Sequence, residues 1–159
     1  MDKNKELLTP TTVDDVDFIA PRLRQADYEE CKAASGNEPL SVLHNGLEIG
    51  DITLTLRSPD GNRVGLCGVV KSNLENAGVV WMVATDDIYQ YQTTFLRNSK
   101  EALAYLGQNY SLLHNCVDAR NTVHMKWLDW MGFTFINKHE TYGAESRPFY
   151  EFVRINKNV

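Results

Sequence analysis

His124 is the first side chain in this sequence that could carry out acid–base chemistry. It lies three residues after Asn121, and an imidazole titrates near neutral pH, so it could act as a general base. The positions three and four residues away on the predicted helix hold no carboxylate and no second histidine that could orient the ring. We therefore expect His124 to be a solvent-facing or half-buried helix residue.

His114, Asn115 and Cys116 form a second candidate group, because a cysteine near a histidine can be activated as a nucleophile. They follow one another in a predicted strand, where neighbouring side chains point to opposite faces. The run therefore does not assemble a site by itself, and we expect Cys116 to pack in the core.

Candidate metal ligands are also few. The acidic group Asp14, Asp15 and Asp17 lacks the glycine and the closing glutamate of a calcium loop, and the preference of a helix N-terminus for negative charge explains it. The chain has three cysteines, an odd number and far apart, which we expect to be buried reduced thiols. They are Cys31, Cys67 and Cys116. We predict no metal site and no disulfide.

Composition restricts the possible partners. A net charge of −5 without clustered Lys and Arg argues against nucleic-acid binding. The sequence has no apolar run of about 18 residues and no signal-peptide core, so we expect no membrane segment and a place in the cytoplasm. Since 43% of the 159 residues are apolar, we expect one domain over residues 1–159 that binds proteins or a small molecule.

The elements that must position these groups begin with helices. Residues 1–10 are expected to be flexible and residues 11–46 to be helical. Thr12 can cap a first helix and Asp27 a second, which Gly36 ends. A further short turn of helix is expected before the Asn-Gly pair that follows.

Residues 47–159 are expected to form the sheet and two main helices, because stretches with a period of two alternate with stretches of helical period. Gly65 and Gly68 inside one strand indicate a bulge or a close backbone neighbour. The expected elements are strands 52–56, 64–70 and 79–84, a helix 85–107, a strand 112–117, a helix 122–132, and strands 133–136 and 149–155.

Residues 121–133, Asn-Thr-Val-His-Met-Lys-Trp-Leu-Asp-Trp-Met-Gly-Phe, and this order of elements resemble the GNAT superfamily of acyl-CoA-dependent N-acyltransferases. Asn121 and the pair Gly132-Phe133 match the family's pattern. The resemblance covers residues 48–155 and implies an α/β (α+β) fold, with a central mixed, mostly antiparallel sheet flanked by helices. If acyl-CoA is bound, the residues expected to contact it are Met82, Ala84, Asn115 and Asn121.

Three features of that family are missing. The family binds the acetyl-CoA diphosphate in a glycine-containing loop at the start of the long helix, whereas residues 85–94 have no glycine, and Asp86 and Asp87 are expected to cap the helix themselves. Leu128 stands where the family usually has a tyrosine that protonates the CoA thiolate, and strand 79–84 offers no carboxylate as general base. We predict no catalytic residue and no cofactor. The alternative is an active acetyl-CoA-dependent N-acetyltransferase that modifies a host or phage protein.

A narrower resemblance involves residues 24–31, 65–68, 81–86 and 121–133, which together are similar to the internal virion protein A family of short-tailed bacteriophages. It implies a GNAT-like scaffold that acts in virion assembly or in the internal core or ejection apparatus. The partners would be other virion proteins or further copies of the chain. The protein would be located in the host cytoplasm during assembly, and the virion would be a further location. A third alternative is an inhibitor of a host protein, which a small acidic domain suits.

Aromatic residues near the C-terminus are candidates for such protein contacts. Trp130 is expected at the edge of the buried face of its helix, where its indole could meet a partner. Phe149, Tyr150 and Phe152 lie in the last predicted strand. If this is an edge strand, they could support the addition of another chain, although packing on the preceding helix is equally consistent.

Overall fold

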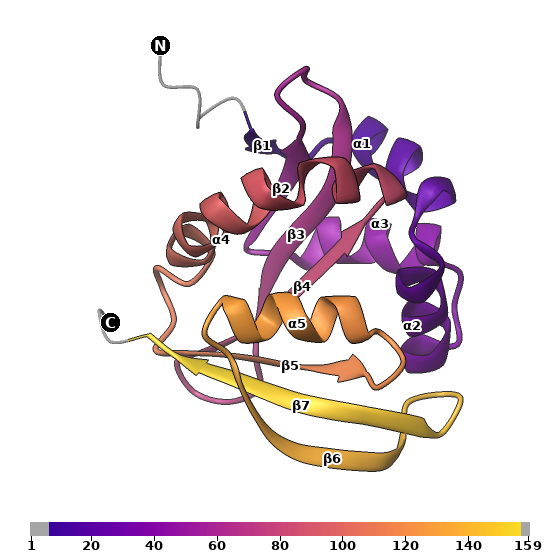
Figure 1. The fold of residues 1–159 in the computed structure, drawn as a ribbon. Helices are drawn as coiled ribbons and strands as arrows, with labels where there is room; N and C mark the ends of the chain where they lie inside the picture. The colour runs from indigo at the N-terminus through magenta and orange to yellow at the C-terminus, as the bar shows by residue number, and fades with distance from the viewer. Residues whose placement is uncertain (1–6, 157–159) are drawn as a thin grey trace.

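Seven strands form one mixed sheet in the computed structural model, which describes residues 7–156 (Figure 1). Their order across the sheet is β1-β2-β3-β4-β5-β7-β6, and neighbours are antiparallel except β4 and β5, which run parallel. This confirms the predicted mixed, mostly antiparallel sheet. The strands are β1 Leu8–Pro10, β2 Ile52–Arg57, β3 Arg63–Lys71, β4 Ala77–Ala84, β5 Leu112–Asp118, β6 Thr134–Tyr142 and β7 Arg147–Ile155.

Helices cover both faces of the sheet. Three α-helices precede β2, and the other two follow β4 and β5. Within residues 7–156, no helix combines the length and the apolar character needed to cross a membrane. The helices are α1 Val13–Ile19, η1 Ala20–Arg22, α2 Gln25–Ser35, α3 Pro39–Ile49, η2 Asp86–Tyr91, α4 Gln92–Leu106 and α5 Thr122–Trp130, where η marks a 3-10 helix.

Thr12 caps α1 as predicted. Its Oγ1 accepts a hydrogen bond from the Asp15 N–H at 3.2 Å, and the Asp15 carboxylate accepts one from the Thr12 N–H at 3.0 Å. Asp15 is buried and also pairs with Arg63, whose Nε lies 2.7 Å from Oδ1. Burial opposes ionisation of Asp15, but its hydrogen bonds with Thr12 and Thr55 and the charge of Arg63 hold the pKa of the carboxyl below its ordinary value.

The other N-terminal elements differ from the predicted ones. Residues 8–10 of the segment expected to be flexible form β1, which pairs with β2, while residues 1–6 lie outside the described residues. The helix expected to be capped by Asp27 begins at Gln25 with Arg24 as its N-cap, so Asp27 lies in the first turn. α3 continues past the Asn-Gly pair that was expected to end it.

The long helix starts later than predicted. α4 begins at Gln92, whereas Asp86 and Asp87 lie in η2 with exposed side chains. Thr85, the N-cap of η2, makes no capping hydrogen bond through its side chain. The prediction that the two aspartates cap the long helix is wrong, because a 3-10 segment of six residues comes first.

Each face of the sheet has its own apolar core. Figure 1 shows α4 and α5 on one side of the sheet and α1 and α3 on the other. Leu103 and Trp127 belong to the first core, and Ile19 and Leu43 belong to the second. Successive residues of β4 contribute to opposite cores, which explains why that strand reads as apolar throughout.

β4 and β5 pair over a short distance and then part. Their register runs from Ala77 opposite Leu112 to Val79 opposite His114, after which both strands continue without pairing to each other. Where two strands separate, their backbone N–H and C=O groups lose their partners in the neighbouring strand and must bond to other groups. This gap is the feature of the fold that positions the candidate site.

Gly65 and Gly68 have the close neighbours that the sequence indicated. A Cβ atom on Gly68 would lie 2.8 Å from the ring of Trp81, and one on Gly65 would lie 2.8 Å from the carbonyl oxygen of Val83. Gly46 in α3 faces the same Trp81 ring, but its added Cβ would lie at 3.4 Å, an ordinary contact.

These distances predict opposite effects for two glycine substitutions. Gly68→Ala should lower the free energy of unfolding by roughly 1–3 kcal/mol, because the packed indole must move. Gly46→Ala should raise it by up to about 1 kcal/mol, because alanine is a better helix former and fits against the ring. Urea unfolding followed by circular dichroism measures both, and equal stabilities would contradict the packing described for Trp81.

Candidate functional site

A cavity of about 330 Å³ lies where β4 and β5 part. Its lining comes from both sides of the sheet, with Cys31 of α2 and Gly46 of α3 on one side and Phe95 of α4 and Leu128 of α5 on the other. Most of the lining is apolar; the polar residues include Glu30, Asn115, His124 and Tyr142. The cavity therefore passes through the sheet and connects the two helical layers.

Asn115 bridges the two strands where they begin to part. Its Nδ2 donates to the carbonyl oxygen of Val80 on β4 at 2.9 Å, and its Oδ1 accepts from the Cys116 N–H at 2.7 Å. The side chain thus satisfies a backbone group that loses its strand partner.

A buried ion pair closes one end of the gap. Arg24, which is 3% exposed, pairs with Asp27 at 2.8 Å, and the same Nη2 donates to Asn121 Oδ1 at 3.1 Å. Asn121 Nδ2 donates in turn to Asp27 Oδ1 at 2.9 Å. The Ala84 N–H donates to Asp27 Oδ2 at 2.9 Å, and the Arg24 N–H donates to the Ala84 oxygen at 2.8 Å. The start of α2 therefore joins the end of β4 to the start of α5.

Two aromatic rings complete the surroundings of Arg24. The guanidinium carbon lies 5.1 Å from the ring centroid of Trp127 in α5 and 5.9 Å from that of Tyr89 in η2, and Nη1 donates to the Tyr89 hydroxyl at 3.1 Å. Burial opposes the charge of Arg24, but Asp27 and Tyr89 hold its pKa above the ordinary value.

His124 is buried in the first turn of α5 and lines the cavity, and its Nδ1 has no hydrogen-bond partner. Burial lowers the pKa of His124, with Asp27 opposing and Arg24 adding to the effect. The expectation of a solvent-facing or half-buried histidine is wrong, because α2 brings a carboxylate and a guanidinium against this turn from a distant part of the sequence.

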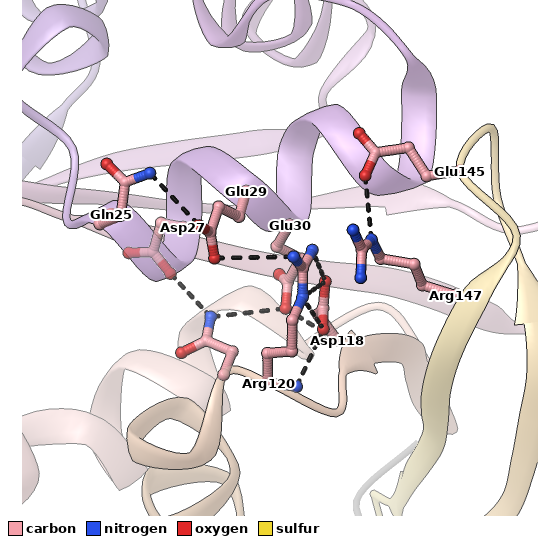
Figure 2. Close-up of polar contacts among 9 residues, drawn as sticks. Gln25, Asp27, Glu29, Glu30, Asp118, Arg120, Glu145 and Arg147 are labelled. Carbon is pink, nitrogen blue, oxygen red and sulfur yellow. Dashed lines mark hydrogen bonds and ion pairs between the residues drawn. The ribbon is translucent and has the colours of Figure 1, made fainter.

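Glu30 follows Asp27 by three residues on α2, and Figure 2 shows Glu30 beside Asp118 at the end of β5. Glu30 Oε1 accepts from the Asp118 N–H at 2.8 Å and from Asn121 Nδ2 at 3.4 Å. Burial of the carboxyl group, together with the charges of Asp27 and Asp118, raises the pKa of Glu30 to about 8 against these hydrogen bonds. The gap therefore has a titratable carboxyl that strand 79–84 does not supply.

A polar rim lies farther out (Figure 2). Arg120 Nη2 is 2.7 Å from Asp118 Oδ2, and Nη1 is 3.7 Å from Glu29 Oε2. Glu145, from the turn between β6 and β7, and Arg147, the first residue of β7, form a neighbouring pair at 3.1 Å. Within residues 7–156, no three His, Cys, Asp or Glu side chains are grouped so that they could hold a metal ion.

Tyr142 and Cys116 line the cavity near Glu30. Burial raises the pKa of Tyr142, and the neighbouring Cys116, Glu151 and Glu30 raise it further. Burial also raises the pKa of the Cys116 thiol, so neither group ionises readily at neutral pH. All three cysteines are free, and Cys67 is the buried one, whereas Cys31 and Cys116 are only half-buried.

The structure divides the four residues expected to contact acyl-CoA into two pairs. Met82 and Asn115 line the cavity, whereas Ala84 and Asn121 belong to the network that closes its end. Their contact with a cofactor stays a prediction.

The four aromatic residues predicted to contact a partner differ in their exposure. Trp130 is 56% exposed, and its Nε1 donates to the Leu96 oxygen. Phe149 and Phe152 are buried, and Tyr150 is half-buried. These three residues do not lie on an edge strand, as had been considered possible, because β7 runs between β5 and β6. Aromatic side chains of β7 pack against neighbouring aromatic rings.

Arg24 and Glu30, at the centre of this site, were not among the predicted site residues, and Asp27 was predicted only as a helix cap. Arg24, Asp27 and Glu30 are spaced three residues apart; Arg24 is the N-cap of α2, and Asp27 and Glu30 lie on neighbouring positions of one face of that helix. That spacing was the available signal. It could not be distinguished from an ordinary solvated face, because nothing nearby in the sequence indicated burial.

Comparison with solved structures gives the same fold several times. A spermidine N-acetyltransferase from Vibrio cholerae in complex with CoA and spermine is 14% identical, with a TM-score of 0.70 over 95% of each chain. A ribosomal-protein-S5-alanine acetyltransferase from Vibrio fischeri is 16% identical, with a TM-score of 0.66 over 95% of this chain and 93% of that one. A GNAT-family acetyltransferase from Streptococcus pneumoniae is 15% identical, with a TM-score of 0.62 over 94% and 98%. No protein-family model and no curated protein matches the sequence.

These similarities correct one prediction and confirm another. The prediction of no cofactor is contradicted, because the Vibrio cholerae structure, which matches nearly the whole chain, is a complex with CoA. That prediction rested on the missing glycines of residues 85–94, which remove one way to bind phosphate but leave the gap between β4 and β5 intact. The predicted fold is confirmed: the chain has the fold of the GNAT acetyltransferases.

Proposed function

We propose that this chain is an acyl-CoA-dependent N-acyltransferase. The observation that carries the proposal is the cavity where β4 and β5 part, because it is lined from both helical layers and includes the Glu30 carboxyl. A donor from one face of the sheet and an acceptor from the other could meet there. The similar structures support the proposal, since all three are acetyltransferases.

The residues around the gap fit the thioester end of such a cofactor. Acyl-CoA would supply an acyl group activated as a thioester. The cavity is mostly apolar, with a few polar side chains, and its volume is within the range of small-molecule sites. Met82 and Asn115 would hold the thioester arm, because both line the cavity beside the parted strands.

Glu30 is the group that we expect to take the proton of the acceptor. An amine attacks the acyl carbonyl carbon through its lone pair, so an ammonium must first lose a proton. Glu30 lines the cavity, and a carboxyl with a pKa of about 8 is a stronger base than an ordinary glutamate.

Tyr142 is the group that we expect to donate a proton to the departing thiolate when the C–S bond breaks. Leu128, at the position where the family usually has this donor, has no proton to give. Tyr142 lines the same cavity, and its raised pKa keeps the hydroxyl protonated at neutral pH.

A second candidate function is a contact with other virion proteins or with further copies of this chain. The resemblance to internal virion protein A motivates it, and the exposure of Trp130 supports it, since a large indole on a helix surface can anchor a protein interface. The two functions are compatible, because α5 carries Trp130 outside and lines the cavity with Leu128.

Replacing Glu30 tests the proposed reaction. Glu30→Gln should lower kcat/KM by roughly 10²- to 10⁴-fold, because the amide cannot accept a proton. The wild-type rate should rise with pH and level off above about 8, the pKa of Glu30, and this rise should be absent in the variant. Thiol release from acetyl-CoA with a panel of amines and host-lysate proteins measures both.

Glu29→Gln is the matched control, because Glu29 belongs to the rim and pairs with Arg120 outside the cavity. Its rate should stay within a few-fold of wild type. Equal rates for Glu30→Gln and wild type would reject Glu30 as the base. No thiol release with any acceptor, together with no thermal shift by acetyl-CoA, would reject the enzymatic function; a binder at a hundred times its Kd would gain about 2.7 kcal/mol.

The raised pKa of Glu30 also predicts how stability depends on pH. The folded chain keeps the Glu30 proton up to about pH 8, whereas the unfolded chain loses it near the ordinary glutamate pKa of 4.5. Stability from this group is therefore fully present below pH 4.5 and is lost as the pH rises toward 8. Urea unfolding at pH 5.5 and 8.5 should show that Glu30→Gln gains stability relative to wild type at the higher pH. An unchanged difference between the two proteins would contradict the burial of this carboxyl.

Trp130 tests the second candidate. Trp130→Ala should reduce self-association in light scattering, or reduce capture of virion proteins, while leaving acetyl-CoA binding unchanged. Tyr105→Ala, another exposed aromatic, serves as the control. Identical association by the wild type and both variants would argue against an interface at Trp130.

A further inference from the structure

The part of the cavity beside α2 and α3 is where the acceptor of the proposed reaction would lie, because it contains the carboxyl and the phenol that would move protons. We call it the acceptor half; it is lined by Glu30, Cys31, Gly46, Trp81, Tyr142 and Phe149. Ala34 of α2 and Asn45 of α3 also line the cavity, and both are exposed. The acceptor half therefore has a mouth between these two helices.

Three aromatic side chains form much of the wall of the acceptor half. The ring centroids of Tyr142 and Phe149 lie 4.6 Å apart. Trp81 is only half-buried, and Gly46 beside its ring has no side chain that could cover it. Aromatic rings contact apolar groups over a large area, and their faces attract an alkylammonium group. The wall therefore suits an amine whose body is apolar.

Negative charge is scarce along the cavity. Among residues 7–156, Glu30 is the only acidic residue that lines it. The nearby carboxylates of Asp118 and Asp27 lie outside the lining and already have cationic partners, Arg120 at 2.7 Å and Arg24 at 2.8 Å. A second ammonium group inside the acceptor half would therefore have no counter-charge, and burying an unpaired charge costs free energy.

We propose that the acceptor is a small monoamine with an apolar or aromatic body, and that diamines and polyamines are poor acceptors. This inference rests on the proposed function and names its substrate class. The amine would meet Glu30, and its body would lie along Trp81 and Phe149. The C–N bond forms as the C–S bond breaks, the amine proton passes to Glu30, and the Tyr142 proton passes to the thiolate. The body is small because the same cavity of about 330 Å³ must also hold the thioester arm.

Pairs of acceptors that differ by one ammonium group test the assignment. Butylamine is matched with putrescine and pentylamine with cadaverine, and phenethylamine tests an aromatic body. With acetyl-CoA as the donor, the wild type should use each monoamine with a kcat/KM roughly 10- to 100-fold above that of the diamine of equal length, because the second charge is unpaired in the cavity. Phenethylamine should be used at least as well as butylamine. Thiol release measures all five rates.

Asn45→Asp adds a carboxylate at the mouth with almost no change of shape, so it should lower KM for cadaverine and reduce the preference for pentylamine several-fold. Asn37→Asp is the matched control, because Asn37 is exposed and lies outside the cavity lining, and it should keep the wild-type preference. An unchanged preference in Asn45→Asp would contradict the mouth between α2 and α3.

Diamines used as well as their matched monoamines, or transfer only to polyamines or peptides, would overturn the assigned substrate class and leave the enzymatic function in place. No thiol release with any acceptor, together with no thermal shift by acetyl-CoA, would overturn the proposed function itself.

Discussion

The buried ion pair between Arg24 and Asp27 is the interaction on which the site depends. A buried charge that loses its partner costs several kcal/mol, so each of these side chains can stay inside only because the other is there. Together they bond to Ala84 and Asn121, which fixes the start of α2 against β4 and α5. That fixed start carries Glu30 to the edge of the cavity.

The parting of β4 and β5 explains why so many polar groups gather in this region. Two strands that separate leave main-chain groups that must be bonded by something else. Asn115 supplies a bond near the start of the gap, and Asp27 and Arg24 supply bonds at its end. The space between them remains as the cavity. The parting of the strands, which leaves main-chain groups without strand partners, therefore also creates a volume that can hold a ligand.

The proposed chemistry uses other elements than those that the resemblance suggested. The carboxyl comes from α2 in place of β4, and the phenol comes from the end of β6 in place of α5. A fold alone does not decide a function, and the missing motif residues did not decide its absence either. What matters is which groups reach the gap, whatever segment carries them.

The sequence by itself determined the order of the main strands and helices from residue 52 onward, the Thr12 cap and the tight packing at Gly65 and Gly68, because these follow from local periodicity, capping and side-chain size. It could not determine the burial of Arg24 and His124 or the raised pKa of Glu30, because side chains of these types usually face solvent. Only the tertiary structure placed them together. The hydrogen bond from Arg24 to Asn121 spans 97 residues, and the pKa of a buried group depends on such distant partners.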